Sequence, residues 1–320
     1  MKHYLAFDIG GTTIKFGVLD QNANILAKDK MTTELSGSSI IANLIKIKEK
    51  YSALYDLQGA AFSMPGFVDV ETGYLKTGGA IMDFYGINFK EIMTEKLALP
   101  VELENDANCV ALAEKWMGTA QDTANFICIT IGTGIGGAVF INNQMVRGHG
   151  YMAGEFGYML INNIFESEHL NNATMSQTAS VKEGLRDAYV KAKAKAKAKD
   201  NLSVEDISGE AVYQFADEGD AVAKKVIDRF YQSIAMGLYN LTFILNPEKI
   251  IIGGAISQRD EIFSKIEEKF QRILDAQGPL KKFKVADLVS IEQCKFNNDS
   301  GLIGAVYHFL NMTQSPAIIK

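Results

Sequence analysis

The sequence has few of the residues that build disulfide frameworks, zinc sites or membrane anchors. Its three cysteines, Cys109, Cys128 and Cys294, lie far apart and form no C-x-x-C pair. This spacing favours reduced, buried thiols over disulfides or bound zinc. The chain shows no basic leader followed by an apolar core, and no apolar run of membrane-spanning length. We therefore expect a cytoplasmic protein with no membrane partner.

The chain also lacks an excess of positive charge, since 32 lysines and arginines against 38 acidic residues give a formal net charge of −6. Nucleic-acid binding requires a basic field, so we expect no nucleic-acid partner. Hydrophobic residues make up 47% of the 320 residues and charged residues 22%, which is enough of both to build packed cores under a polar surface. A chain of this length is long for one core, so two domains are expected.

The stretch from Asp8 to Lys15 combines an acid, two glycines and two threonines between two short apolar runs. The runs 4–7 and 16–19 are typical of strands, so the motif is predicted to lie at a hairpin turn. Adjacent glycines allow backbone N–H groups to approach a phosphate, and the acid could face a divalent metal. A tight hairpin with an aspartate at the strand end is the alternative that this stretch alone leaves open.

A second copy of this pattern covers residues 126–141, which align with residues 4–19 without a gap when Gly132 is set on Gly10. Thr130 then replaces Asp8, so only the first copy carries the acid. The repeat predicts two similar domains with a nucleotide clamped between them. The glycines 132, 134 and 137 also satisfy G-x-G-x-x-G. However, a β-type run follows them instead of a helix, which disfavours a dinucleotide fold.

Three further stretches could carry chemistry. Asp106 stands at or near the start of a predicted helix over residues 107–117, where an N-cap role alone would explain it. The glycine-rich loop 148–158 contains Glu155 and suits hydrogen bonding to a polyol, although it could equally be a surface loop. Residues Gly253 and Gly254 follow a predicted strand and would let a flat ring approach the backbone; a simple strand-to-helix turn is the alternative. The alternating lysines and alanines of 191–199 indicate a solvated helix.

With these motifs in view, the sequence resembles the ROK family of bacterial sugar kinases and regulators, within the actin-like and hexokinase-like ATPase superfamily. The resemblance runs essentially end to end and rests on several short motifs in order. It implies an α/β fold of two similar ribonuclease H-like domains, each a mixed sheet flanked by helices, with the active-site cleft between them. The expected boundaries are 1–118 plus about 301–320 for the N-terminal domain and 119–300 for the C-terminal domain. The motifs are residues 8–15, 63–66, 104–108, 132–137, 154–157 and 253–254.

The resemblance also implies roles for individual residues. Asp106 would be the catalytic base, which takes a proton from a sugar hydroxyl as that hydroxyl attacks the γ-phosphate of ATP. Asp8 would hold Mg²⁺, through water. The implied sugar-binding residues are Gly66, Asn105, Asp106, Glu155 and Tyr158, and the implied ATP-binding residues are Asp8, Gly10, Gly11, Thr12, Thr13, Lys15, Thr133, Gly134, Gly253 and Gly254.

The chain departs from the family pattern near Tyr158, where many members carry a histidine that joins a cysteine-rich loop in a zinc site. Residues 160–178 contain no cysteine, and their only histidine is His169. One histidine cannot close a tetrahedral site, so we predict no zinc. A further sugar-binding glutamate of the family falls near residues 171–173, which contain no glutamate. These departures from the family pattern leave open which sugar the protein binds.

These observations support an ATP-dependent hexose kinase, glucokinase-like or fructokinase-like, that phosphorylates a primary 6-hydroxyl. A β-glucoside or disaccharide kinase of the same family is the alternative within the class. From another class, a sugar-sensing regulator would need a DNA-binding domain ahead of the first motif, and only seven residues precede Asp8. A pseudo-enzyme is disfavoured because both Asp8 and Asp106 are retained. Homodimers are common in the family, so a homodimer is expected.

Overall fold

The computed structural model describes residues 1–162, 173–195 and 207–313. The chain divides into two compact units. Unit 1 comprises Met1–Asp122, Asn143–Ala153 and the described part of Lys295–Lys320, and unit 2 comprises Thr123–Asn142 and Gly154–Cys294. The sequence placed the segment 143–153 with the C-terminal domain, whereas its contacts group it with unit 1. Unit 1 therefore includes three separate stretches of the chain.

Unit 1 is built on a five-stranded mixed sheet of order β3-β2-β1-β4-β8. β1 pairs antiparallel with β2, which confirms the predicted N-terminal hairpin, and β2 pairs antiparallel with β3. β1, β4 and β8 run parallel, so their carboxyl ends meet at one edge of the sheet. The strands are β1 (His3–Ile9), β2 (Thr13–Asp20), β3 (Ile25–Thr32), β4 (Leu57–Met64) and β8 (Val101–Asn105).

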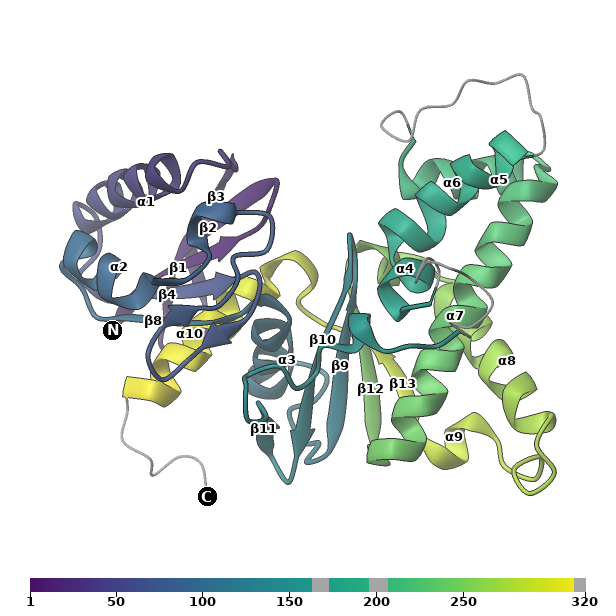
Figure 1. Cartoon of the computed structure of the whole chain (residues 1–320). Coiled ribbons are helices and arrows are strands. Elements are labelled where there is room, and N and C mark those ends of the chain that lie inside the picture. Colours follow the sequence, from purple (N-terminus) through teal and green to yellow (C-terminus); the bar gives the residue numbers. More distant parts are fainter. Residues whose placement is uncertain (163–172, 196–206, 314–320) are drawn as a thin grey trace. The chain divides into compact units, whose positions relative to one another are not determined.

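Helices cover both faces of this sheet (Figure 1). Side chains alternate between the faces of a strand, so Leu5 and Phe7 pack in one core while Tyr4 and Ala6 pack in another. The first core lies under the helices α1 (Gly37–Ser52) and α2 (Phe89–Leu97), and the second under α3 (Asp106–Met117) and α10 (Ser300–Thr313). The C-terminal helix α10 packs on α3 and on the strands of this sheet, within unit 1.

A small sheet of three two-residue strands is inserted between β4 and α2. It consists of β5 (Val68–Asp69), β6 (Tyr74–Leu75) and β7 (Ile87–Asn88), with the 3₁₀ turn η1 (Met82–Phe84) before β7. These strands have no signal in the sequence, because two residues are too few to show a period of two.

Unit 2 repeats the strand order of unit 1, with the order β11-β10-β9-β12-β13. The β9–β10 pair is antiparallel, and β9, β12 and β13 are parallel, as in the corresponding strands of unit 1. The duplication inferred from the hairpin motif therefore extends to the whole sheet. The strands are β9 (Phe126–Ile131), β10 (Ile135–Ile141), β11 (Gln144–Val146), β12 (Lys249–Gly253) and β13 (Ser290–Gln293), of which β11 lies in the segment grouped with unit 1.

The helices of unit 2 pack around the 25-residue helix α7 (Ala221–Leu245) (Figure 1). Asp220 caps its start by accepting hydrogen bonds from two backbone N–H groups, and Asn246 ends it in a left-handed conformation just before Pro247.

The predicted Lys-Ala helix is present as far as Lys195, and the rest of it lies outside the described residues. No helix in the described ranges is both long and apolar enough to cross a membrane. The other elements are η2 (Phe156–Tyr158), α4 (Met175–Ala179), the π-helical turn η3 (Val181–Asp187), α5 (Ala188–Lys195), α6 (Gly209–Asp217), η5 (Ala255–Gln258), α8 (Ile262–Asp275), α9 (Val285–Leu288) and η6 (Asn297–Asp299).

Candidate functional site

The first glycine-threonine motif forms the turn between β1 and β2, as predicted. The Gly10 N–H donates to the Thr13 carbonyl oxygen at 3.0 Å, which closes the turn. A Cβ on Gly10 would lie 2.8 Å from that carbonyl oxygen, so the turn requires glycine. The Thr33 hydroxyl donates to the Gly10 carbonyl at 2.7 Å and braces the turn from β3's end. Gly11 and Thr12 are exposed at its tip, where their N–H and hydroxyl groups could meet an anion.

Asp8 lies at the carboxyl end of β1, next to this turn. The strand register places Lys15 opposite it, and the Lys15 Nζ lies 3.3 Å from Asp8 Oδ2. The buried hydroxyl of Ser63, at the end of β4, donates to Asp8 Oδ1 at 2.7 Å. A Cβ on Gly301, in α10, would overlap the Asp8 carboxylate. Three elements thus hold this acid in one place.

The end of β8 carries the predicted sugar and catalytic residues. Asn105 caps α3, because its Oδ1 accepts the Asn108 N–H at 3.1 Å. Its Nδ2 donates to the Gly66 carbonyl at 2.9 Å, which ties the 65–66 turn to the start of α3. Asn105 is buried, so the structure gives this side chain a positioning task. Asp106 is the first residue of α3 and follows the cap.

The carboxylate of Asp106 is accessible and electrostatically unusual. The residue keeps an exposed surface, and its Oδ1 accepts the Ala107 N–H at 2.8 Å. Displacement of water by the surrounding protein raises the pKa of Asp106 to about 6, and the charge of Asp8 adds to the increase. The hydrogen bonds from Ala107 and Asn105 act in the opposite direction. A carboxylate with this pKa is a stronger base than an ordinary aspartate and is still ionised near neutral pH.

Unit 2 brings its two predicted nucleotide motifs together. Thr133 and Gly134 are exposed in the turn between β9 and β10, where the Gly132 N–H donates to the Gly134 carbonyl at 3.0 Å. Gly253 pairs with Thr130 across the parallel strands β12 and β9, so Gly253 and Gly254 lie beside the start of this turn. Gly254 has a φ of +97°, and a Cβ there would overlap the Ile131 carbonyl. Glycine is therefore required.

The loop with Glu155 packs on the same hairpin of unit 2. Gly154 has a φ of +93° and lies against the Gly137 carbonyl, while Gly157 lies against the Ile135 carbonyl. Glu155 precedes η2, and Tyr158 at the end of η2 is 68% exposed. Glu155 and Tyr158 thus belong to unit 2, whereas Gly66, Asn105 and Asp106 belong to unit 1.

The metal predictions rest on residue type. Within the described ranges, no group of three or more histidine, cysteine or acidic side chains is arranged to hold a metal. His169 and most of the loop that departs from the family's zinc pattern lie outside the described residues. Mg²⁺ keeps several waters and substrate oxygens in its shell, so one fixed carboxylate such as Asp8 fits the way proteins bind it with a nucleotide.

Three residues that shape the site had no role assigned to them from the sequence. Ser63 and Gly301 contact Asp8, and Arg147 contacts Glu104, the residue two positions before Asp106. Ser63 belongs to the 63–66 motif named from the sequence, which was a usable signal. Arg147 gave none, because its partner lies 43 residues away.

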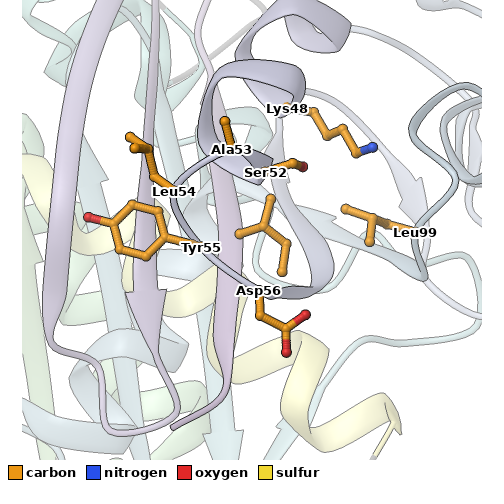
Figure 2. A pocket seen from close by; sticks show the side chains of 8 residues that line it. Lys48, Ser52, Ala53, Leu54, Tyr55, Asp56 and Leu99 are labelled. Atoms are coloured by element: carbon orange, nitrogen blue, oxygen red, sulfur yellow. The ribbon is translucent and has the colours of Figure 1, made fainter.

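A surface hollow of unit 1 lies away from these residues (Figure 2). It is lined by the end of α1 and the start of β4, whereas Ser63 and Asp8 lie at the carboxyl ends of their strands. The polar ends of Lys48, Tyr55 and Asp56 point in three different directions (Figure 2). Ligands of parallel sheets bind at the carboxyl ends of the strands, so this hollow is not the candidate site.

Each unit therefore carries a glycine-threonine turn at the edge of a mixed sheet of the same strand order, and unit 1 adds two acids; the duplicated sheet is that of the two-domain actin-like class. The ROK family model matches residues 4–311. A β-glucoside kinase from Listeria monocytogenes is 38% identical over 95% of this chain and 96% of its own length. A ROK family protein from Streptococcus pneumoniae, solved in complex with sucrose, is 32% identical with a TM-score of 0.81, covering 97% of this chain and 98% of its own.

A ROK family glucokinase from Streptomyces griseus, solved in complex with glucose and AMPPNP, is 25% identical with a TM-score of 0.77. The alignment covers 95% of this chain and 97% of that one. The chain belongs to the ROK family, as the sequence resemblance predicted. With relatives of this kind along its whole length, it is a sugar kinase of that family.

Proposed function

We propose that this sugar kinase transfers the γ-phosphoryl group of ATP to a primary hydroxyl of a β-glucoside, with Asp106 as the general base. The exposed carboxylate of Asp106 carries the mechanistic part of this proposal, because its pKa of about 6 suits a base at neutral pH. The 38% identity to a β-glucoside kinase supports the choice of sugar.

In the proposed reaction, the sugar hydroxyl hydrogen-bonds to a carboxylate oxygen of Asp106. The hydroxyl oxygen attacks the γ-phosphorus, the bond from that phosphorus to the β,γ-bridging oxygen breaks, and ADP leaves with its electron pair. Asp106 takes the hydroxyl proton. The Asn105–Gly66 hydrogen bond fixes the backbone beside Asp106, so the acceptor meets a preformed surface.

ATP is proposed to bind through the two glycine-threonine turns and the glycine pair of unit 2. The exposed N–H and hydroxyl groups of Gly11, Thr12, Thr133 and Gly134 suit phosphate oxygens. Lys15 adds a positive charge beside Asp8. Mg²⁺ held near Asp8, through water, would neutralise charge on the β- and γ-phosphates. Gly253 and Gly254 are proposed to face the adenosine.

The acceptor is proposed to contact Gly66 and Asn105 from unit 1 and Glu155 and Tyr158 from unit 2. A carboxylate such as Glu155 accepts hydrogen bonds from sugar hydroxyls, and a phenol can both donate and accept. The exposed ring of Tyr158 also offers an apolar face to a group attached to the sugar. The free hexose is the second candidate, favoured by the likeness to a glucokinase solved with glucose.

A coupled assay of ADP release tests both parts of the proposal. We expect cellobiose and methyl β-glucoside to give a higher kcat/KM than glucose, N-acetylglucosamine or methyl α-glucoside. A glucose value tenfold above that of every β-glucoside would favour the hexose instead. Asp106→Asn should abolish turnover while Asp56→Asn, an exposed carboxylate away from the site, should not change it. If Asp106→Asn turns over like the parent, Asp106 is not the base.

A further inference from the structure

Glu104 is a buried carboxylate with a full set of hydrogen-bond donors around it. It is 1% exposed and lies at the end of β8, two residues before Asp106. Its Oε1 accepts the Asn105 N–H and the Asn108 Nδ2, both at 2.9 Å. Its Oε2 accepts Arg147 Nε at 3.1 Å and Nη2 at 2.7 Å. A buried charge persists only when it is compensated in this way.

The two oxygens of Glu104 therefore contact different parts of unit 1. Oε1 holds the first turn of α3, because Asn105 is the cap of that helix and Asn108 is its third residue. Oε2 holds Arg147, which comes from the separate segment 143–153. Asp106 lies between the two residues that Oε1 fixes.

Three polar contacts that anchor the segment 143–153 to unit 1 are spread along it. Lys115 Nζ, on α3, lies 2.7 Å from Asn143 Oδ1, and Lys76 Nζ donates to the Gly150 carbonyl at 3.1 Å. The bidentate Arg147–Glu104 pair lies between them along the segment. Of the three anchors, only this pair reaches the β8–α3 junction where Asp106 begins the helix.

His308 does not supply the balancing charge. Its Nδ1 lies 3.7 Å from Glu104 Oε2, but burial lowers the pKa of His308 to about 4, so the imidazole is neutral at pH 7. The nearby guanidinium of Arg147, first among the partners of Glu104, lowers the pKa of that carboxyl against the effect of burial. Glu104 is ionised, and Arg147 is its cation.

We propose that Arg147 and Glu104 are positioning residues for the catalytic base: the ion pair fixes the start of α3, and with it the direction in which the Asp106 carboxylate meets the acceptor hydroxyl. The inference rests on the proposed role of Asp106. Arg147 acts through Glu104 and then through the backbone of Asn105, so neither member of the pair needs to touch the substrate.

A purely structural ion pair is the competing explanation, and the same strand provides a matched control. Glu102 lies two residues before Glu104 on β8 and is also buried, with Lys90 Nζ at 2.7 Å. Among the described residues, neither member of this pair hydrogen-bonds to the first turn of α3, and Lys90 comes from α2. Loss of either pair should lower stability, but only loss of the Arg147–Glu104 pair should disturb Asp106.

The test uses three variants of the pair: Arg147→Gln, Glu104→Gln and the double variant that carries both substitutions. Lys90→Gln is the control to which they are compared. We expect the first three to lower kcat by about 10- to 100-fold, the scale of a misplaced catalytic group. The KM for ATP should change by less than about threefold, since unit 2 and the β1–β2 turn are untouched. Lys90→Gln should lower Tm but leave kcat within about twofold of the parent.

Two features separate positioning from lost stability. The double variant should be no slower than the slower single variant, because both substitutions remove the same interaction. Arg147→Lys, which keeps the charge without the bidentate geometry, should give an intermediate kcat. Fluorescence of Trp116, which lies on α3 and stacks on Tyr307, verifies that each variant is folded.

Failure of this inference differs from failure of the proposed function. If Asp106→Asn is inactive but Arg147→Gln matches Lys90→Gln in both kcat and Tm, the pair is only structural and the positioning role is wrong. If Asp106→Asn is active, the base assignment fails first, whatever the Arg147 variants do. A fold-loss in kcat for the double variant that equals the product of the two single fold-losses would also contradict the positioning role.

Discussion

The Ser63 hydroxyl donates to Asp8 Oδ1 at 2.7 Å across the parallel strands β1 and β4. The register sets these two residues side by side at the carboxyl edge of the sheet. Lys15 contacts the other carboxylate oxygen, and Gly301 leaves room for the group. The proposed metal-side acid is therefore held in one orientation by contacts within unit 1.

Removal of this hydroxyl tests the orientation. Ser63→Ala should raise the KM for MgATP on the order of tenfold, because a carboxylate that lacks its orienting partner binds a hydrated metal less well. Steady-state kinetics at varied MgATP measures it. Thr242→Val, which removes a buried hydroxyl that bonds to the Leu238 carbonyl in unit 2, is the control and should leave this KM unchanged. An unchanged KM for MgATP in Ser63→Ala would show that the hydrogen bond from Ser63 does not orient Asp8 for the metal.

The raised pKa of Asp106 predicts the acid side of the pH profile. A base works only when it is deprotonated, so kcat/KM should fall about tenfold per pH unit below pH 6. The charge of Asp8 contributes to the increase in pKa, so Asp8→Asn should move this limb to lower pH in whatever activity remains. A limb that stays in place in Asp8→Asn would show that another group titrates.

His308 predicts a loss of stability in acid. Its pKa is about 4 in the folded protein and 6.5 in the reference state. Between these values the unfolded chain binds a proton that the folded chain does not, so stability falls as the pH drops from 6.5 to 4. The difference in pKa corresponds to at most about 3 kcal/mol. Denaturant titrations at several pH values measure the free energy of unfolding. In His308→Leu it should fall less steeply with decreasing pH than in the parent. In His149→Ala, which replaces an exposed histidine, it should fall as steeply as in the parent.

Ala98 ends α2 in a left-handed conformation, with φ of 49° and ψ of 42°. A side chain costs about 1 kcal/mol or more in this region, whereas glycine adopts it freely. Ala98→Gly should therefore raise the free energy of unfolding by roughly 1 kcal/mol. The matched control is Ala53→Gly, at the end of α1, where φ is −73° and glycine should be destabilising. Opposite signs for the two variants are expected in chemical denaturation.

The local parts of the fold could be predicted because their signals lie within a few residues. The two glycine-threonine turns and the helix that begins at Asp106 follow from turn chemistry, capping and apolar spacing. The alignment of residues 4–19 with 126–141 predicted two similar domains, and the two sheets share one strand order. The small sheet of two-residue strands was missed, since such strands have no period to detect.

By itself, the sequence determined the family and the duplicated α/β plan and pointed to Asp8 and Asp106, since these depend on short motifs whose residues are contiguous. Only the tertiary structure decided how those acids are held. Ser63 is 55 residues from Asp8, and Arg147 is 43 residues from Glu104. Such pairs form when parallel strands end at one edge of a sheet and a distant segment folds onto it, so no local pattern encodes them. Packing also gave Asn105 its buried bond to Gly66, because burial of an amide requires a partner that only the fold can supply.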